Sequence, residues 1–179
     1  FWSVTLTGGH VMDQIRKISE GLKNDIDNPY DSSKPKILFV EGGSQYDIYA
    51  MRSAGIDPAT GKEIFIKKNG EYTFNYDEKE RVAVGNTNPI LQGSLMNTLR
   101  YKGFSISVAT SYTFGSDYFN STLKNKVENI DLNYNVDRRV FTDRWKEPGD
   151  HTRFLGIGTS SSSSQYSERF VEKRNELYI

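Results

Sequence analysis

Residues 101–114 read YKGFSISVATSYTF. From Phe104 onward, large apolar side chains and small polar side chains alternate at almost every position. Alternation with a period of two predicts a β-strand whose two faces differ in chemistry. The face with the large side chains contacts a protein core if the strand belongs to a soluble β-protein, and lipid if it belongs to a membrane barrel.

The dipeptide Lys102-Gly103 predicts a two-residue turn that pairs this strand with the segment before it. Counting outward from the turn places Tyr101 opposite Phe104 and Leu99 opposite Ile106. Both strands then carry their large apolar residues on the same face, although the pairing rests on the turn alone. The candidate lipid-facing residues are Leu95, Leu99, Tyr101, Phe104, Ile106, Val108, Tyr112 and Phe114.

Aromatic residues lie at both ends of this face, and aliphatic residues lie between them. At about 3.3 Å per residue, the strand from Phe104 to Phe114 spans about 33 Å. A membrane strand needs about 9–11 tilted residues with aromatic residues at both interfaces, whereas a typical soluble strand has about 5–6 residues. The small hydroxyl residues of the other face suit a water-filled lumen, while Asn97 and Thr110 fit lipid poorly. Alternation alone leaves both interpretations open, and the aromatic ends and the tight turn favour the barrel.

The composition bounds the classes of function. The 179 residues carry 23 Lys+Arg and 23 Asp+Glu, so the net charge of zero gives no electrostatic case for nucleic acid as a partner. The chain contains no cysteine, which excludes disulfides and thiolate metal sites. No apolar run approaches the length of a transmembrane helix, but the strands of a membrane barrel hardly register on hydropathy.

A second hairpin is predicted over residues 63–76. Asn69-Gly70 is the preferred pair for a type I′ turn, in which both central residues have positive φ. Such a turn sets Phe65 opposite Phe74 and Lys68 opposite Glu71, and both pairs fit cross-strand preferences.

The other segments show weaker patterns. Residues 11–22 fit either a short helix or a strand with a bulge, and residues 55–61 and 147–150 are turn clusters. Apolar residues at helical spacing within residues 121–145 predict two short surface helices, and the serine tract at residues 159–164 is typical of exposed chain. Strand-like alternation reaches both ends, so we expect the sequence to be a fragment. Further strands are expected at residues 1–7, 37–40, 46–51 and 169–179.

The sequence contains no strong catalytic or metal-binding pattern. His10 and His151 have no ligand-spaced partner, and neither a G-x-S-x-G elbow nor a complete phosphate-binding glycine motif occurs. We therefore expect no catalytic, cofactor or metal site, and the substrate-binding residues stay unassigned. The charged residues within 137–144 favour an ion-paired loop over a substrate contact. Trp145 with its neighbour Tyr134 could stack on a sugar ring, but anchoring of the loop is the favoured interpretation.

Five short segments occur in a characteristic order along nearly the whole chain. They are residues 49–62, which include AGIDPATG, residues 85–104, residues 111–115, residues 144–150 and residues 167–172. In this order they resemble segments of the SusC/RagA-type TonB-dependent outer-membrane transporters. Each segment alone is weak evidence, whereas the five together are specific.

The resemblance implies an all-β, mainly antiparallel fold that is a fragment of a transmembrane β-barrel with long extracellular loops carrying short helices. Residues 1–179 would belong to one barrel domain, and residues 116–165 would form a long extracellular loop region. The segment would come from the late part of the barrel, without the plug domain, the TonB box or the closing C-terminal strands.

The function implied by the resemblance is non-enzymatic. The chain would form part of an importer of oligosaccharides or peptides in the outer membrane of a Gram-negative cell. Its partners would be outer-membrane lipid, a SusD-like surface lipoprotein acting as a lid, and the TonB complex through the absent N-terminal region. A soluble β-rich carbohydrate-binding module is the competing class, and it predicts that the face around Leu95 and Ile106 is buried against a second sheet. A hydrolase domain is a weaker third class.

Overall fold

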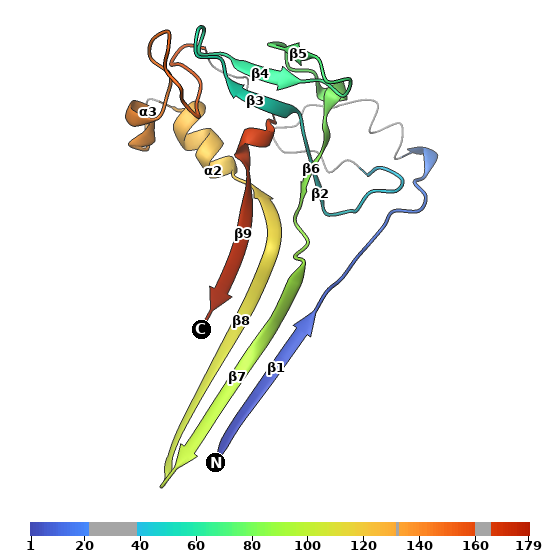
Figure 1. The fold of residues 1–179 in the computed structure, drawn as a ribbon, viewed down its shortest axis with the longest axis vertical. Helices are drawn as coiled ribbons and strands as arrows, with labels where there is room; N and C mark the ends of the chain where they lie inside the picture. Colours follow the sequence, from blue (N-terminus) through green and yellow to red (C-terminus); the bar gives the residue numbers. More distant parts are fainter. Residues whose placement is uncertain (22–38, 132, 160–165) are drawn as a thin grey trace.

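The computed structural model describes residues 1–21, 39–131, 133–159 and 166–179 (Figure 1). A long antiparallel sheet with the strand order β1-β7-β8-β9 extends away from a cluster of smaller elements (Figure 1). The β7–β8 turn lies at the far end of this sheet, and the smaller sheets and the helices gather at the opposite end. The strands of the long sheet are β1 (Trp2–Gly9), β7 (Leu91–Tyr101), β8 (Phe104–Phe119) and β9 (Val171–Tyr178).

The cluster at the other end contains two small sheets and several short helices. One sheet pairs β2 (Asp47–Ala50) with β6 (Val82–Asn86), and the other has the order β3-β4-β5. The predicted fold class is therefore confirmed as mainly antiparallel β-structure with short helices in the connections, and the sheet over the described residues is open. The remaining elements are β3 (Arg52–Ile56), β4 (Glu63–Ile66), β5 (Tyr72–Thr73), the 3-10 helices η1 (Glu78–Glu80) and η3 (Glu168–Phe170), α2 (Ser121–Leu123), the π-helix η2 (Lys124–Glu128) and α3 (Arg139–Thr142).

The β7–β8 pairing agrees with the prediction made from the turn. Tyr101 lies opposite Phe104, Leu99 lies opposite Ile106, and the register continues without a shift to Leu91 and Phe114. Lys102 and Gly103 have φ angles of 44° and 87°, so both central residues occupy the left-handed region that a type I′ turn requires.

The register predicted for the second hairpin is wrong by one residue. Phe65 lies opposite Thr73 instead of Phe74, and the Glu71 carbonyl accepts from the Lys67 N–H at 2.9 Å. Gly70 has a φ of 89°, whereas Lys102 is the one non-glycine residue with positive φ in the described part of the chain. The Asn69 side-chain oxygen accepts from the Glu71 N–H, which is a local bond that competes with the type I′ conformation. The result is a longer loop that ends in a left-handed glycine.

The apolar core lies among the loop elements and not against the long sheet. Leu123 and Val127, four residues apart on α2 and η2, are buried with Val140, Phe154 and Phe170. The helical spacing seen in residues 121–145 therefore corresponds to two helical segments that bury one side against this core.

Three weaker sequence predictions have different outcomes. Over residues 11–19 the chain forms neither the short helix nor the bulged strand, because Ile15 instead exchanges main-chain hydrogen bonds with Gly42 and Gly43, each 2.8 Å long. The short strand predicted at residues 37–40 lies partly outside the described residues, and residues 39–40 are not in a strand. Residues 160–164 of the serine tract also lie outside the described residues.

Candidate functional site

The long sheet presents one continuous apolar face built from three strands. Strand β1 pairs with β7 so that Trp2 lies opposite Leu99, and Leu99 lies opposite Ile106 of β8. Because side chains alternate along every strand, this register brings the apolar residues of all three strands to the same face. The next rows up the sheet are Val4, Asn97 and Val108, then Leu6, Leu95 and Thr110.

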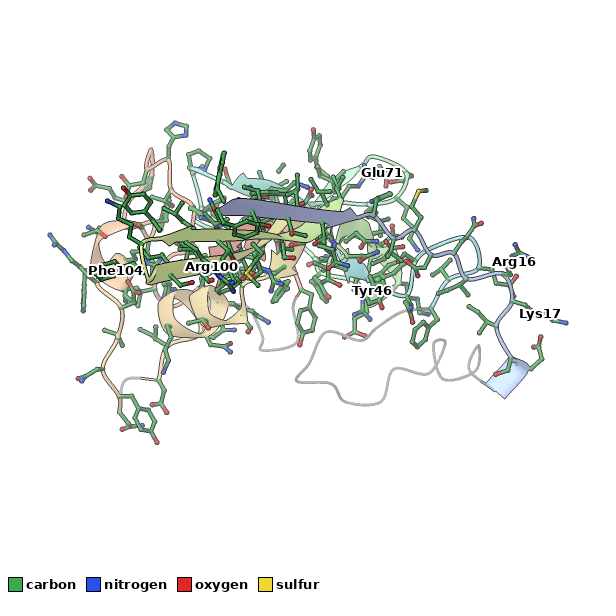
Figure 2. All side chains as sticks on the ribbon, turned by 90° about the horizontal axis from the view of Figure 1, so that it is seen from below. Arg16, Lys17, Tyr46, Glu71, Arg100 and Phe104 are labelled. Atoms are coloured by element: carbon green, nitrogen blue, oxygen red, sulfur yellow. The ribbon has the colours of Figure 1, made fainter. Side chains whose placement is uncertain are left out.

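This face is uncovered by any other described element. Phe104 is 79% exposed and Ile106 is 62% exposed, whereas side chains of this kind are normally buried in a soluble domain. Figure 2 looks along the sheet and shows Phe104 and Arg100 at the tips of the strands, far from the segment that carries Arg16 and Lys17. Of the predicted lipid-facing residues, the exposed ones are Leu99, Tyr101, Phe104, Ile106, Val108 and Phe114, and the half-buried ones are Leu95 and Tyr112.

The contribution of β1 to the apolar face was not predicted from the sequence. Trp2, Val4 and Leu6 are all exposed on the apolar face. The alternation of residues 1–7 was a visible signal, but nothing local shows that β1 pairs with a strand about ninety positions away. The tertiary structure therefore widens the face from two strands to three.

The polar residue in the middle of the face has a partner. The Trp2 indole Nε1–H donates to the Asn97 side-chain oxygen at 2.8 Å. This bond lowers the cost of placing an amide oxygen among apolar side chains, since an unpaired polar group in an apolar medium is unfavourable.

The opposite face of the sheet carries small hydroxyl side chains. The Thr7 and Ser94 hydroxyls lie 2.8 Å apart, and the Thr98 and Ser107 hydroxyls lie 3.2 Å apart. These pairs join neighbouring strands by side-chain hydrogen bonds, which stabilise cross-strand contacts in a wet environment. The sheet therefore separates an apolar surface from a hydroxyl surface.

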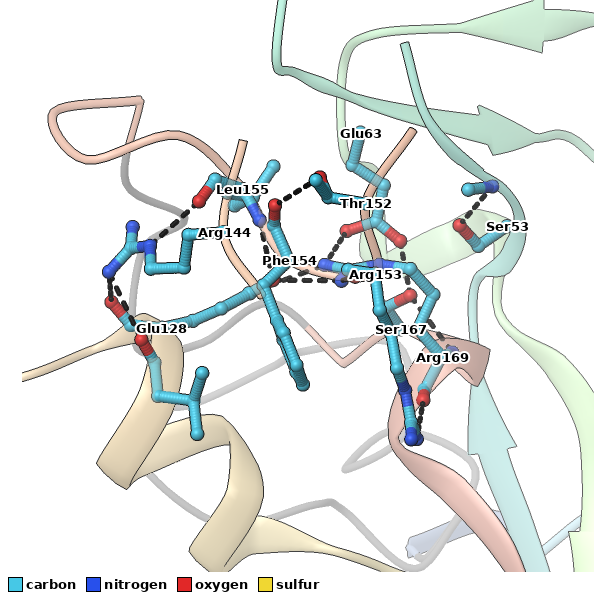
Figure 3. Close-up of polar contacts among 12 residues, drawn as sticks. Ser53, Glu63, Glu128, Arg144, Thr152, Arg153, Phe154, Leu155, Ser167 and Arg169 are labelled. Atoms are coloured by element: carbon cyan, nitrogen blue, oxygen red, sulfur yellow. Dashed lines mark hydrogen bonds and ion pairs between the residues drawn. The ribbon is translucent and has the colours of Figure 1, made fainter. Parts of the chain in front are cut away.

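A buried ion network ties the loop cluster together (Figure 3). Arg169 of η3 donates to Glu63 of β4 at 2.7 Å and to Glu128 of η2 at 2.8 Å. The three side chains are only 8%, 4% and 1% exposed. The Ser167 hydroxyl also donates to Glu63, and the Leu155 N–H donates to Glu128 at 3.1 Å. One guanidinium thus joins segments of the chain that are 41 and 106 residues from it.

The electrostatics of this network keep Arg169 charged. Burial by itself would lower the pKa of Arg169, but the hydrogen bonds and charges of Glu63 and Glu128 outweigh burial and raise it. Burial lowers the pKa of Lys124 to about 8, against the opposing attraction of Glu128 and Glu63. Lys124 is buried on η2 with its ammonium 4.5 Å from the centre of the Tyr166 ring.

The charged residues within 137–144 divide into two structural roles. Asp137 and Arg139 form an ion pair of 2.7 Å at the surface, and hydrogen bonds from Arg139 hold the pKa of Asp137 down at about 2. Arg144 is buried and donates to the carbonyl oxygens of Leu155 at 2.7 Å and Gly156 at 2.8 Å, and to those of η2 (Figure 3). Asp137 and Arg139 thus form the ion-paired loop that the sequence favoured, and Arg144 holds the loop to η2.

Trp145 anchors the loop, as the favoured interpretation of the sequence had it. Its indole N–H donates to the Pro58 carbonyl oxygen at 2.9 Å. A methyl group at Gly61 would lie 2.5 Å from the Trp145 ring, and one at Gly156 would lie 2.9 Å from it, so the ring is packed between two glycines. Tyr134 is 68% exposed and takes no part in this contact.

The described residues show neither a metal cluster nor a spanning helix. Within them, no three His, Cys, Asp or Glu side chains are grouped so as to bind a metal ion. No helix in the described part of the chain has the length and apolar character to cross a membrane. A polar hollow of about 490 Å³ beside α3 is lined by Thr142, Arg144, Lys146, Glu147, Asp150, His151 and Thr152.

Comparison with known proteins identifies the fold. No family model matches the sequence, and no curated protein matches it. The structure of the RagAB peptide transporter superposes with a TM-score of 0.75 and 21% identity over 98% of this chain and 19% of that chain. The RagAB peptide importer superposes with TM-scores of 0.72 in its open-open state and 0.70 in its closed-closed state, again at 21% identity over 98% of this chain. The chain therefore shares the fold of part of that transporter and spans about a fifth of its length.

Proposed function

We propose that this chain forms part of the barrel wall of a TonB-dependent nutrient importer in the outer membrane of a Gram-negative cell. The observation that carries the proposal is the sheet of β1, β7 and β8, which has an uncovered apolar face on one side and a hydroxyl face on the other. A wall strand of a membrane barrel needs both, because one side meets hydrocarbon and the other meets water.

The apolar face is assigned to the lipid. Its aliphatic middle is bounded by Trp2, Tyr101 and Phe104 at the turn end and by Tyr112 and Phe114 at the loop end. Aromatic residues at both limits of an aliphatic band match the two interfaces of a bilayer. The tight β7–β8 turn would then lie on the periplasmic side.

The loop cluster is assigned to the extracellular side. The connection between β8 and β9, which includes most of residues 116–165, buries the core around Val127 and Phe154 and the ion network of Arg169. This structure above the barrel would contact a SusD-like surface lipoprotein that closes over the substrate. The imported substrate would be an oligosaccharide or a peptide, and the likeness to a transporter named for peptides supports the second.

Coupling to the TonB complex would depend on regions outside this sequence. The proposed role of the chain is thus mechanical, as part of the wall and of the surface loops. It calls for no catalytic residue and no cofactor.

The exposure of the apolar face also weighs against the alternative of a soluble carbohydrate-binding module. That alternative requires a second sheet over Leu95, Leu99 and Ile106, and Leu99 and Ile106 are 49% and 62% exposed. The polar hollow beside α3 lies on the loop cluster, and its lining lacks the apolar and aromatic side chains that are typical of a ligand cleft.

The two tryptophans allow a direct test of the lipid-facing surface. Trp2 lies on the apolar face and Trp145 lies in the loop cluster. In the full-length product expressed in outer membranes and transferred to vesicles, fluorescence of Trp2 should be quenched by brominated acyl chains. Any other tryptophan of that product would be replaced beforehand, and Trp145→Phe then isolates the signal of Trp2. The matched variant Trp2→Phe isolates Trp145, which should be insensitive to the bromine atoms. Equal insensitivity of both tryptophans would contradict the proposal and favour the soluble module.

A further inference from the structure

Tyr112 crosses a neighbouring strand and bonds to the next one. It lies opposite Gly93 of β7, and Gly93 lies opposite Gly8 of β1, so the three residues form one row across three strands. The Tyr112 hydroxyl donates to the Thr7 carbonyl oxygen of β1 at 2.7 Å. A side chain on β8 is therefore bonded directly to a strand that is not its neighbour.

The two glycines make this crossing possible. A methyl group at Gly93 would lie 2.5 Å from the Tyr112 hydroxyl oxygen and 2.1 Å from the Thr7 carbonyl oxygen, and both distances are prohibitive. At Gly8 a methyl group would lie 3.3 Å from the same hydroxyl oxygen. Any side chain in the middle of the row would lift the tyrosine ring off the sheet and break its bond to β1.

The register of β1 needs such a device. A slip by one residue would turn the apolar side chains of β1 to the hydroxyl face, but a slip by two would keep both faces intact. Val4 would then lie opposite Leu95, where Leu6 lies now, and the apolar character of the face would change little. The β7–β8 register is set by its tight turn, whereas β1 has no turn to β7, so the facing pattern alone leaves its position open.

We propose that Tyr112, Gly93 and Gly8 act as a register lock that specifies how β1 pairs with β7. A slip by two residues that moves Leu6 opposite Gly93 would put Leu6 in the place of Gly8, where a Cβ atom lies 3.3 Å from the Tyr112 hydroxyl oxygen and the longer leucine side chain would collide with the tyrosine. The lock thus penalises the slipped pairing by a steric clash, whereas the main-chain carbonyl oxygen of Thr5 would still be placed to accept from the Tyr112 hydroxyl. This role is independent of the proposed transport function, because it concerns assembly of the sheet in any environment.

Cysteine cross-linking measures the register directly, because the chain has no cysteine of its own. Thr5 lies opposite Met96, so the pair Thr5→Cys with Met96→Cys reports the native register. The pair Thr5→Cys with Ser94→Cys reports the slip by two residues. Both pairs would be placed in the full-length product, with any other cysteine removed, and oxidised in isolated membranes.

Removal of the Tyr112 ring should allow β1 to pair with β7 in the slipped register. Tyr112→Ala is expected to raise the ratio of slipped to native cross-link about tenfold, which corresponds to about 1.4 kcal/mol. Tyr112→Phe keeps the ring over Gly93 and should leave the ratio close to its original value, because the lost hydrogen bond has a main-chain acceptor in either register. Tyr101→Ala is the matched control, since Tyr101 is an aromatic residue of the same face that crosses no glycine.

A second variant leaves the tyrosine in place. Leu6→Gly removes the side chain that would meet Tyr112 in the slipped pairing, so it should also raise the slipped cross-link. The register lock is overturned if neither variant raises the slipped cross-link. For Leu6→Gly this means a slipped cross-link at the original level, and for Tyr112→Ala it means an unchanged ratio or no cross-link of either kind.

Discussion

Trp145 donates its indole N–H to the main-chain carbonyl oxygen of Pro58, which lies 87 positions earlier in the chain, at 2.9 Å. The turn that contains Pro58 is held by Asp57, whose carboxylate accepts from the Thr60 hydroxyl at 2.5 Å and from the Ala59 N–H at 3.2 Å. The Gly149 N–H donates to the same Pro58 carbonyl oxygen at 2.9 Å. A rigid turn near the start of the loop cluster thus binds the loop that precedes β9.

Gly61 should tolerate no side chain, because a methyl group there would lie 2.5 Å from the Trp145 ring and the residue has a φ of 68°. We expect Gly61→Ala to destabilise the loop cluster by about 1–3 kcal/mol and to speed amide hydrogen exchange over residues 143–159. Gly70→Ala is the matched control, since Gly70 has a φ of 89° but no atom within 4 Å of the added methyl group. Equal effects of the two variants would show that backbone strain, and not the contact with Trp145, decides the result.

Arg169 neutralises two buried carboxylates, so its loss should be costly. Arg169→Met would leave Glu63 and Glu128 buried without their shared cation, and we expect a loss of about 3–5 kcal/mol in the free energy of unfolding of the loop cluster. Arg139→Met removes an exposed ion pair with Asp137 and should change the same quantity by less than about 1 kcal/mol. Urea unfolding of the detergent-solubilised protein would measure both, and similar losses for the two variants would contradict the central role of Arg169.

Lys124 should make the stability depend on pH in the alkaline range. Burial lowers its pKa from 10.5 to about 8 in the folded chain, so between these values the unfolded chain binds more protons than the folded one. The contribution of Lys124 to stability is therefore unfavourable at neutral pH and becomes less unfavourable as the pH rises from about 8 towards 10.5.

Lys124→Met removes the titrating group and tests this dependence. The difference in the free energy of unfolding between the original chain and the variant should shift in favour of the original chain from pH 7.5 to pH 9.5. Lys126→Met, on the same helix but at an exposed position, serves as the control for removing a lysine from η2. A flat difference for Lys124→Met would show that the buried ammonium has no lowered pKa.

The two faces of β8 should differ in how well they tolerate a charged side chain. Val108 lies on the apolar face near the middle of the strand, and its neighbour Ala109 lies on the hydroxyl face. If the apolar face meets lipid, Val108→Arg should reduce the free energy of folding into vesicles by about 2–4 kcal/mol. Ala109→Arg should have a much smaller effect, because the side chain enters water. Equal costs at both positions would contradict the assignment of the faces.

Local chemistry decided which parts of the fold were predictable. The β7–β8 register followed from Lys102-Gly103, because a two-residue turn leaves one way to count the pairs and the alternation on both sides agrees with it. The register predicted for the hairpin around Asn69-Gly70 was wrong because the same dipeptide occurs in two types of loop. The Asn69 side chain bonds to the Glu71 N–H, and that bond shifted Phe65 by one position.

The candidate site was predictable only in part for a related reason. Alternation is a property of a single strand, so the eight residues predicted for the apolar face could be read from the sequence, and six of them are exposed. The contribution of Trp2, Val4 and Leu6 depends on pairing with a distant strand, and no pattern in the sequence encodes that register. The partners of Arg169 were also invisible, because single charged residues such as Glu63 and Glu128 look like any solvated side chain before they are brought together.

By itself, the sequence determined the elements that neighbouring residues control: the alternating strands, the tight turn between β7 and β8, and the short helices that bury Leu123 and Val127. The tertiary structure decided where β1 docks, which charges are buried together, and that Tyr112 reaches across Gly93 to Thr7. The physical reason is that strand alternation repeats every two residues and so permits several registers. Only side chains that meet in space, through a hydrogen bond or the room left by a glycine, distinguish one register from the next.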